Sequence, residues 1–265
     1  MKVWTIANQK GGVGKTTTSV SLGGLLVQMG LRTLLIDIDP HASLTSYFRY
    51  DPNTIEQSVY SLFKAVADKQ TIPPDCLIHT TDVEGLDLMP AVMALATLDR
   101  QAGRLDGMGL VIKEALARLE SYYDYAIIDC PPILGVLMIN AIAACERLII
   151  PVQTEFLALK GLDRMLHTLG MILKSRHTEL PYIIVPTMYD VRTRASKESL
   201  RILRKDYADN LWHNLIPIDT RFRDASRAGI PPALFDPRSR GVAAYGRLLQ
   251  HLQQGQERKS QRLSM

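Results

Sequence analysis

Cysteine is scarce in this chain of 265 residues. The three cysteines, Cys76, Cys130 and Cys145, are odd in number and far apart, and no pair has the spacing of a zinc site. This pattern predicts neither a disulfide framework nor a structural metal site, and it fits a reducing compartment such as the cytoplasm. Cys130 is expected to fill space in the core and not to carry redox chemistry.

Long apolar runs and a strong charge bias are also missing. No apolar run approaches eighteen residues and the first residues have a strand pattern instead of a signal sequence, so we expect neither membrane spanning nor secretion. The 31 basic and 27 acidic residues leave a net charge of +4, which does not indicate nucleic-acid binding by itself. With 46% hydrophobic residues, the chain is long enough for one sizeable domain.

Short β-branched segments alternate with longer segments of helical periodicity. This alternation predicts an α/β fold with a mostly parallel, twisted sheet and helices on both faces. The predicted strands are 3–7, 33–38, 86–90, 125–129, 148–152, 183–187 and 215–218, and the clearest helices are 15–29, 110–122, 160–174, 196–209 and 241–253. Residues 50–82, interrupted by three prolines, are expected to form an irregular helical insertion. We expect one domain, 1–253, and a disordered basic tail, 254–265.

A glycine-rich segment lies between the first predicted strand and the first predicted helix. Its glycines let successive backbone N–H groups point into one concavity, and the helix N-terminus favours anions there. This is the pattern of a phosphate-binding loop, in which Lys15 reaches the β- and γ-phosphates and Thr16 offers its hydroxyl to Mg²⁺. The residues expected to bind the nucleotide are Gly11, Gly12, Val13, Gly14, Lys15, Thr16 and Thr17.

Acidic residues stand at the ends of two other predicted strands. The carboxyl ends of parallel strands form the edge where open α/β sheets bind ligands. Asp129 ends a strongly apolar strand, as in a Walker B motif, and is expected to hold Mg²⁺ through water. Asp37 and Asp39 end the second strand. We favour a catalytic role for Asp39, and for Asp37 both a catalytic and a structural role stay open.

The loop carries a second lysine, Lys10, directly before its glycines. In this form it resembles the deviant Walker A motif of the ParA/MinD/Soj family of dimerising ATPases, and the Asp37-to-Pro40 and Asp129-to-Pro132 segments are similar to the switches of that family. The resemblance implies that Lys10 contacts the partner's ATP in a homodimer and that Asp39 orients the water that attacks the γ-phosphate. His41 departs from the usual family pattern.

Further residues are assigned by the same resemblance. Met188, Pro217 and Asp219 would contact adenine, and Asn140 would lie either near the dimer interface or on a plain helix surface. A stripe of basic residues recurs on one face of the helix predicted at 196–209, where family members that move on the nucleoid contact DNA. These residues, named here the basic stripe, are Lys197, Arg201, Arg204 and Lys205. The alternatives are a solvated helix face and a docking site for an acidic protein.

The resemblance implies a slow, partner-stimulated ATPase that positions a plasmid, a chromosome region or a chemosensory cluster through an adaptor protein. It would lie in the cytoplasm, on the nucleoid or at a pole. The run at 39–41 and the segment 156–162 are similar to family members that position chemosensory clusters. The alternative is a MinD-like membrane-associated regulator, although the apolar stripe begun by Leu248, Leu249 and Leu252 does not continue.

Overall fold

The computed structural model describes residues 1–98, 108–176 and 179–263. In this part of the chain, a seven-stranded sheet has the order β3-β4-β2-β5-β1-β6-β7. All neighbouring strands are parallel except β3 and β4. The strands are β1 (Lys2–Ile6), β2 (Thr33–Asp37), β3 (His79–Thr80), β4 (Leu86–Met89), β5 (Tyr125–Asp129), β6 (Arg147–Gln153) and β7 (Tyr182–Thr187).

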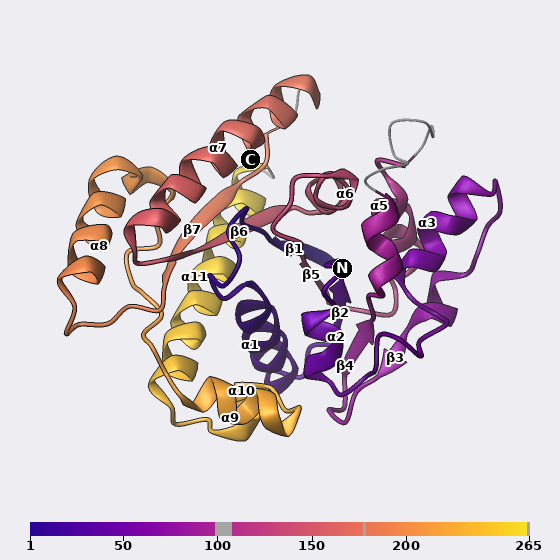
Figure 1. The fold of residues 1–265 in the computed structure, drawn as a ribbon, viewed down its shortest axis with the longest axis horizontal. Helices are drawn as coiled ribbons and strands as arrows, with labels where there is room; N and C mark the ends of the chain where they lie inside the picture. Colours follow the sequence, from indigo (N-terminus) through magenta and orange to yellow (C-terminus); the bar gives the residue numbers. More distant parts are fainter. Residues whose placement is uncertain (99–107, 177–178, 264–265) are drawn as a thin grey trace.

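The central strands are covered on both faces, which explains their continuous apolar runs. Every residue of β2 and β5 is buried. Figure 1 shows the sheet between two layers of helices. Helices α1 (Lys15–Gln28) and α11 (Arg240–Leu263) cover one face, and α5 (Val111–Arg118), α6 (Val136–Ala144) and α7 (Phe156–Arg176) cover the other. The predicted α/β class is therefore confirmed.

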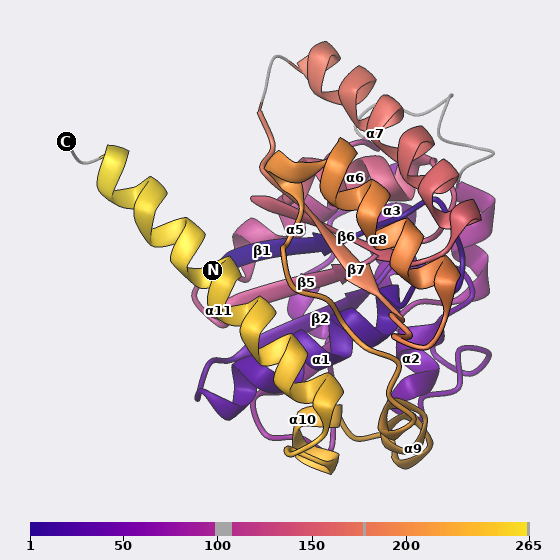
Figure 2. The same ribbon diagram turned by 90° about the vertical axis from the view of Figure 1, so that its left-hand side faces the viewer.

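Shorter elements surround these layers. α8 (Arg194–Asp206) lies beside α7 at the β7 edge, and α9 and α10 lie near the beginning of α11 (Figures 1 and 2). The remaining helical elements are α2 (Ser43–Tyr47), α3 (Val59–Ala67), η1 (Pro74–Leu77), η2 (Met93–Thr97), η4 (Ala208–Asn210), α9 (Arg221–Ala228) and α10 (Pro232–Phe235). Among the described residues, no helix combines the length and the apolar character needed to cross a membrane.

Several predicted elements differ from the structure. The strand predicted at 215–218 is wrong, because this stretch forms only an isolated bridge between Pro217 and Tyr189. Proline has no N–H for a regular ladder, which accounts for the interruption. The insertion at 50–82 contains helical turns, as expected, but also the antiparallel strand β3. Helix α11 continues past its predicted end at Gln253. The division at residue 253 stays a prediction, and residues 264–265 lie outside the described chain.

Candidate nucleotide-binding and hydrolysis site

The glycine-rich loop turns directly from β1 into α1. Gly12 and Gly14 have φ angles of 75° and 90°, in the left-handed region where a side chain would be strained. Gly14 also begins α1, and its carbonyl accepts the N–H of Thr18 at 2.9 Å. The Lys15 side chain turns back toward the loop, with its Nζ 3.4 Å from the Lys10 carbonyl oxygen. The conformation of the loop is thus set by its backbone, and the Lys15 ammonium lies beside it.

Asp129 faces the first turn of α1. Its Oδ2 accepts a hydrogen bond from Thr16 Oγ1 at 2.7 Å, and its Oδ1 accepts one from Ser19 Oγ at 3.1 Å. Burial raises the pKa of Asp129 to about 6, while the two hydroxyls and the charge of Lys15 act in the opposite direction. The Thr16 hydroxyl and the Asp129 carboxylate lie next to each other, and both are hard oxygen donors of the kind that Mg²⁺ prefers. These two residues therefore fit the expected metal.

Asp37 lies directly opposite Asp129 in the register of β2 and β5. It is fully buried and accepts hydrogen bonds from the N–H and the hydroxyl of Thr45, both at 2.8 Å, and from the N–H of Asp39 at 3.1 Å. Burial, followed by the charge of Asp129, raises the pKa of Asp37 to about 8. These contacts tie β2 to α2, which favours the structural role for Asp37.

Asp39 is the more accessible of the two carboxylates that end β2. Its side chain is 13% exposed, and its Oδ1 accepts hydrogen bonds from the backbone N–H of His41 at 3.0 Å and lies 2.9 Å from His41 Nδ1. The residue that departs from the usual family pattern therefore contacts the candidate catalytic carboxylate. The charge of Asp39 also acts on Asp129, which places both acids at the same edge of the sheet.

A cavity of about 580 Å³ extends from the loop along the carboxyl edge of the sheet. Met188, Pro217 and Asp219, the residues predicted to contact adenine, all line it together with Gly14 and Thr17 of the loop. Asp219 also accepts the N–H groups of Arg221 at 3.0 Å and of Gly241 at 2.8 Å. Its carboxylate therefore holds the entries of α9 and α11 in place.

The end of β7 supports both the loop and this cavity. The hydroxyl of Thr187 donates to the carbonyl of Val13 at 2.8 Å, and the carbonyl oxygen of Thr187 accepts the N–H of Thr154 at 3.1 Å. Met188 has a φ of 52°, and its methyl group lies toward Gly14. This positive φ turns the chain sharply at the cavity wall.

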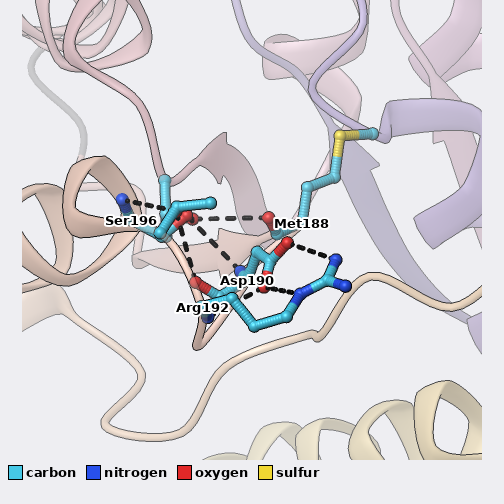
Figure 3. Close-up of polar contacts among 6 residues, drawn as sticks. Met188, Asp190, Arg192 and Ser196 are labelled. Atoms are coloured by element: carbon cyan, nitrogen blue, oxygen red, sulfur yellow. Dashed lines mark hydrogen bonds and ion pairs between the residues drawn. The ribbon is translucent and has the colours of Figure 1, made fainter.

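A polar junction connects this wall with the start of α8 (Figure 3). Ser196, in the first turn of α8, has its hydroxyl 3.2 Å from Thr154 Oγ1 and accepts the N–H of Asp190 at 3.4 Å. Asp190 in turn receives two hydrogen bonds from the Arg192 guanidinium, at 2.9 and 2.8 Å, which help to lower the pKa of Asp190 to about 2. The junction fixes the helix that carries the basic stripe relative to the nucleotide cavity.

Lys10 is held within its own chain. Its ammonium forms an ion pair with Glu155, the residue before α7, and its backbone N–H donates to Asn8 Oδ1 at 3.0 Å. The Lys10 side chain is 26% exposed. The resemblance implied that Lys10 reaches a partner's ATP, and the structure shows the intrachain contact that this lysine would have to give up.

The basic stripe lies on the exposed face of α8, while Leu200 and Leu203 are buried on the other face. Arg201 is paired with Glu198, with Nη2 and Oε1 2.7 Å apart. Among the described residues, Lys197 and Lys205 form no ion pair. Arg204 donates to the His213 carbonyl oxygen at 3.5 Å. Within the described part of the chain, three of the four stripe residues therefore have no ion pair with an acidic side chain.

One alternative from the sequence needs correction. Asn140 is not a surface amide, because it is fully buried and its amide donates to the carbonyls of Met108 at 2.5 Å and Val136 at 2.9 Å. The arginines after residue 220 have contacts outside the basic stripe: Arg221 pairs with Asp236 at 3.2 Å, and Arg223 and Arg227 line the cavity beside the loop.

Sequence reasoning missed residues that share the site only through folding. Ser19, Glu155, Phe222 and Tyr245 fall into this group, because none belongs to a motif. Ser19 alone had an available signal, since it lies one helical turn after Thr16 and must face the same side of α1.

Comparisons with known proteins agree with this site. A family model described as an AAA domain matches residues 1–182. The sporulation initiation inhibitor protein Soj of Bacillus subtilis is 40% identical over 245 residues, which are 92% of this chain and 95% of its own. The chromosome partitioning protein ParA of Myxococcus xanthus is 32% identical over 98% of this chain and 91% of its own.

Two solved structures that resemble this chain contain a bound ATP analogue. A protein of Mycobacterium smegmatis described as cobyrinic acid a,c-diamide synthase, solved with an ATP analogue and magnesium, has a TM-score of 0.83 and 32% identity and covers 97% of this chain and 96% of its own. A plasmid partition protein of Borrelia burgdorferi bound to AMPPNP has a TM-score of 0.79 and 26% identity, with 96% of this chain and 99% of its own covered.

The fold and the site define a P-loop ATPase whose loop carries the additional lysine. The chain belongs to the ParA/MinD/Soj family of deviant Walker A ATPases. Membership confirms the resemblance and makes ATP with Mg²⁺ the nucleotide and metal of this ATPase. It also favours the positioning of an intracellular cargo over the MinD-like alternative.

Proposed function

We propose that two copies of this chain close around two ATP molecules and use slow, partner-stimulated hydrolysis to time the positioning of a cargo. The observation that carries the proposal is the convergence of Lys15, Thr16, Asp39 and Asp129 at one sheet edge, with Lys10 beside them but held by Glu155. A plasmid, a chromosome region and a chemosensory cluster are the cargo classes considered, each reached through an adaptor. The proposed location is the cytoplasm, at the nucleoid or a pole.

Each residue of the site has a proposed task. The N–H groups of Gly11 to Thr17 and the ammonium of Lys15 hold the phosphates, because a row of donors and one cation match their charge. Mg²⁺, when bound, neutralises charge between the β- and γ-phosphates. Thr16 and Asp129, already hydrogen-bonded to each other, supply the oxygens at that point. Met188, Pro217 and Asp219 form the wall against adenine.

Asp39 is the proposed residue that orients the attacking water. Its carboxylate is partly exposed at the site, whereas that of Asp37 is enclosed by Thr45 and the backbone. The contact with His41 fixes the orientation of the Asp39 carboxylate in the free protein. An orienting group of this kind contributes about two to four orders of magnitude to a hydrolysis rate.

We propose further that the basic stripe binds DNA without reading its sequence. Lysine and arginine side chains along one face of a helix attract the phosphates by their opposite charge, and such contacts do not distinguish one base from another. With Arg201 engaged by Glu198, about three contacts per protomer remain, so the expected slope of log affinity against log salt is about −3 per protomer. Binding is expected to be stronger with ATP because a dimer presents two stripes together.

The test is DNA binding by wild type and by a Lys197→Gln/Lys205→Gln variant, on two unrelated duplexes, with an ATP analogue and with ADP. We expect equal affinity for both duplexes, tighter binding with the analogue, and a flatter salt slope for the variant. A matched control is Lys64→Gln/Lys113→Gln, which removes two charges from exposed positions of α3 and α5 on the other side of the molecule (Figure 1). No binding by wild type at low salt would leave the stripe as a solvated helix face or as a docking site for an acidic protein partner.

A further inference from the structure

Residues 39–42 form a tight turn between β2 and α2, at the carboxyl edge of the sheet. The N–H of Ala42 donates to the Asp39 carbonyl oxygen at 2.8 Å, and the carbonyl oxygen of Ala42 accepts the N–H of Ser46 at 2.9 Å. Pro40 suits the second position of such a turn, because its ring fixes φ near the value that this position needs. The turn therefore connects the candidate catalytic residue Asp39 directly to the start of α2.

Ala42 has a strained backbone. Its φ of 51° and ψ of 39° lie in the left-handed region, which is unfavourable for a residue with a Cβ atom. Such a conformation persists only where the surrounding contacts determine it. Ala42 is buried, and both of its backbone polar groups are hydrogen-bonded. The turn is therefore a defined structure that can hold the side chains of Asp39 and His41 in place.

The two oxygen atoms of the Asp39 carboxylate have different surroundings. Oδ1 accepts the backbone N–H of His41 at 3.0 Å and lies 2.9 Å from His41 Nδ1. Oδ2 has no hydrogen bond with any residue that the structure describes. The Asp39 side chain is partly exposed, so water can reach the carboxylate. His41 thus occupies Oδ1, and Oδ2 keeps its capacity to accept a hydrogen bond from water.

The contact between the His41 ring and Asp39 requires a donor on the ring. An ionised carboxylate only accepts hydrogen bonds, so Nδ1 carries the proton that lies between the two groups. An Nδ1–H group is present in the imidazolium ion and in one of the two neutral tautomers. The contact therefore depends on a donor at the position of Nδ1 and not on a positive charge of the ring.

The beginning of α2 is anchored independently of His41. Asp37 accepts hydrogen bonds from the N–H and the hydroxyl of Thr45, both at 2.8 Å. The same hydroxyl accepts the N–H of Ala91 at 2.9 Å, and all three residues are buried. The His41 side chain, in contrast, is 74% exposed. A change of the His41 side chain is therefore expected to leave α2 in place and to alter only the contact with Asp39.

We propose that His41 is a positioning residue for ATP hydrolysis, whose Nδ1–H holds Oδ1 of Asp39 so that Oδ2 faces the attacking water. The proposal rests on the proposed role of Asp39 in orienting that water. A carboxylate that is already held by one oxygen has less rotational freedom to lose when it orients a reactant. His41 therefore raises kcat through Asp39, whereas ATP binding depends on the glycine-rich loop and Lys15.

The first experiment measures kcat and KM for ATP hydrolysis by variants of the full chain with Mg²⁺. His41→Ala removes the donor, so kcat is expected to fall about tenfold, as for one hydrogen bond to a charged group, with KM within about twofold of wild type. His41→Asn places an amide N–H group near the position of Nδ1 and is expected to retain most of the wild-type kcat. His41→Gln places its amide near Nε2 and is expected to resemble His41→Ala.

Two further measurements accompany these variants. Half-maximal dimerisation of His41→Ala, followed by sedimentation, is expected at the same ATP concentration as in wild type, because His41 is proposed to act on hydrolysis alone. His213→Ala, at an exposed position after η4, is the control for the loss of an imidazole, and its kcat is expected to equal that of wild type.

A double variant separates His41 from Asp39. If His41 acts through Asp39, adding His41→Ala to Asp39→Ala slows hydrolysis no further. A further loss in the double variant, a kcat of His41→Ala above about half that of wild type, or equal kcat values for His41→Asn and His41→Gln would overturn the role of His41, while the effect of Asp39→Ala stands. If Asp39→Ala itself hydrolyses ATP normally, the proposed role of Asp39 fails and that of His41 with it.

Discussion

The Lys10 ammonium is ion-paired with the Glu155 carboxylate of the same chain. These residues are 145 positions apart in the sequence: Lys10 lies in the loop between β1 and α1, and Glu155 lies between β6 and α7. Any role for Lys10 in contacting a second protomer requires this pair to open first. Glu155 is therefore expected to oppose dimerisation, by holding back the lysine that the partner needs.

Removing the charge of Glu155 tests this relationship. Glu155→Gln keeps the size of the side chain but frees the Lys10 ammonium, so half-maximal dimerisation is expected at a lower ATP concentration than in wild type. Sedimentation velocity over an ATP series measures this shift. Glu84→Gln, at an exposed position before β4, is the control for the loss of one carboxylate. A Glu155→Gln protein that needs the same ATP concentration as wild type would show that the pair does not restrain Lys10.

The two loop lysines are expected to act at different steps. Lys15→Ala should abolish ATP binding, because the β- and γ-phosphate charge loses its main partner. Lys10→Ala should keep ATP binding by the monomer and lose both the ATP-dependent dimer and hydrolysis. Binding of a fluorescent ATP analogue, together with sedimentation, separates the steps. If Lys10→Ala dimerised and hydrolysed ATP normally, Lys10 would not have the role in the dimer that the deviant Walker A motif implies.

The buried acids predict how stability depends on pH in the nucleotide-free protein. The pKa of Asp37 rises to about 8 and that of Asp129 to about 6, both above the ordinary 3.8. Between about pH 4 and about pH 8, the folded protein therefore holds protons that the unfolded chain has released. The stability from these protonated acids is present at the low end of this range and is lost as the pH rises through the two pKa values.

Melting temperatures across this range check the prediction. The melting temperature of the nucleotide-free protein should fall as the pH rises from about 5 to about 8. For each proton that the folded protein holds and the unfolded chain does not, the free energy of unfolding decreases by up to about 1.4 kcal/mol per pH unit. Asp37→Asn cannot titrate at this position, so its midpoint should change less over the upper half of the range, whatever its absolute stability. The same slope in both proteins would assign the pH dependence to other groups.

Local motifs explain why the glycine-rich loop between β1 and α1, and the acids Asp39 and Asp129 at the ends of β2 and β5, could be placed from the sequence. Gly12, Gly14, Lys15 and Thr16 act within one turn of chain, so their spacing alone defines the cradle. The alternation of strands and helices likewise determined the fold class, because a parallel sheet needs a crossover between strands.

The remainder of the site depends on contacts between distant segments. Tyr245 on α11 lines the cavity and has its hydroxyl 2.9 Å from Thr18 Oγ1, and no local pattern indicates this contact between distant segments. The surface alternative for Asn140 was wrong because polarity alone suggested exposure, whereas the carbonyl of Met108, before α5, accepts a hydrogen bond from its amide in the core. Arg201 was assigned to the basic stripe from the sequence, and the structure shows that Glu198, one turn before it, pairs with it.

The most direct test of the proposed ATP-dependent cycle combines hydrolysis and sedimentation for Asp39→Ala. Because Asp39 is proposed to orient water and not to hold nucleotide, its loss should slow ATP hydrolysis by about two orders of magnitude or more. The same protein should sediment as a dimer with ATP and Mg²⁺ and as a monomer with ADP. Unchanged hydrolysis, or a protein that stays monomeric with ATP, would contradict the account.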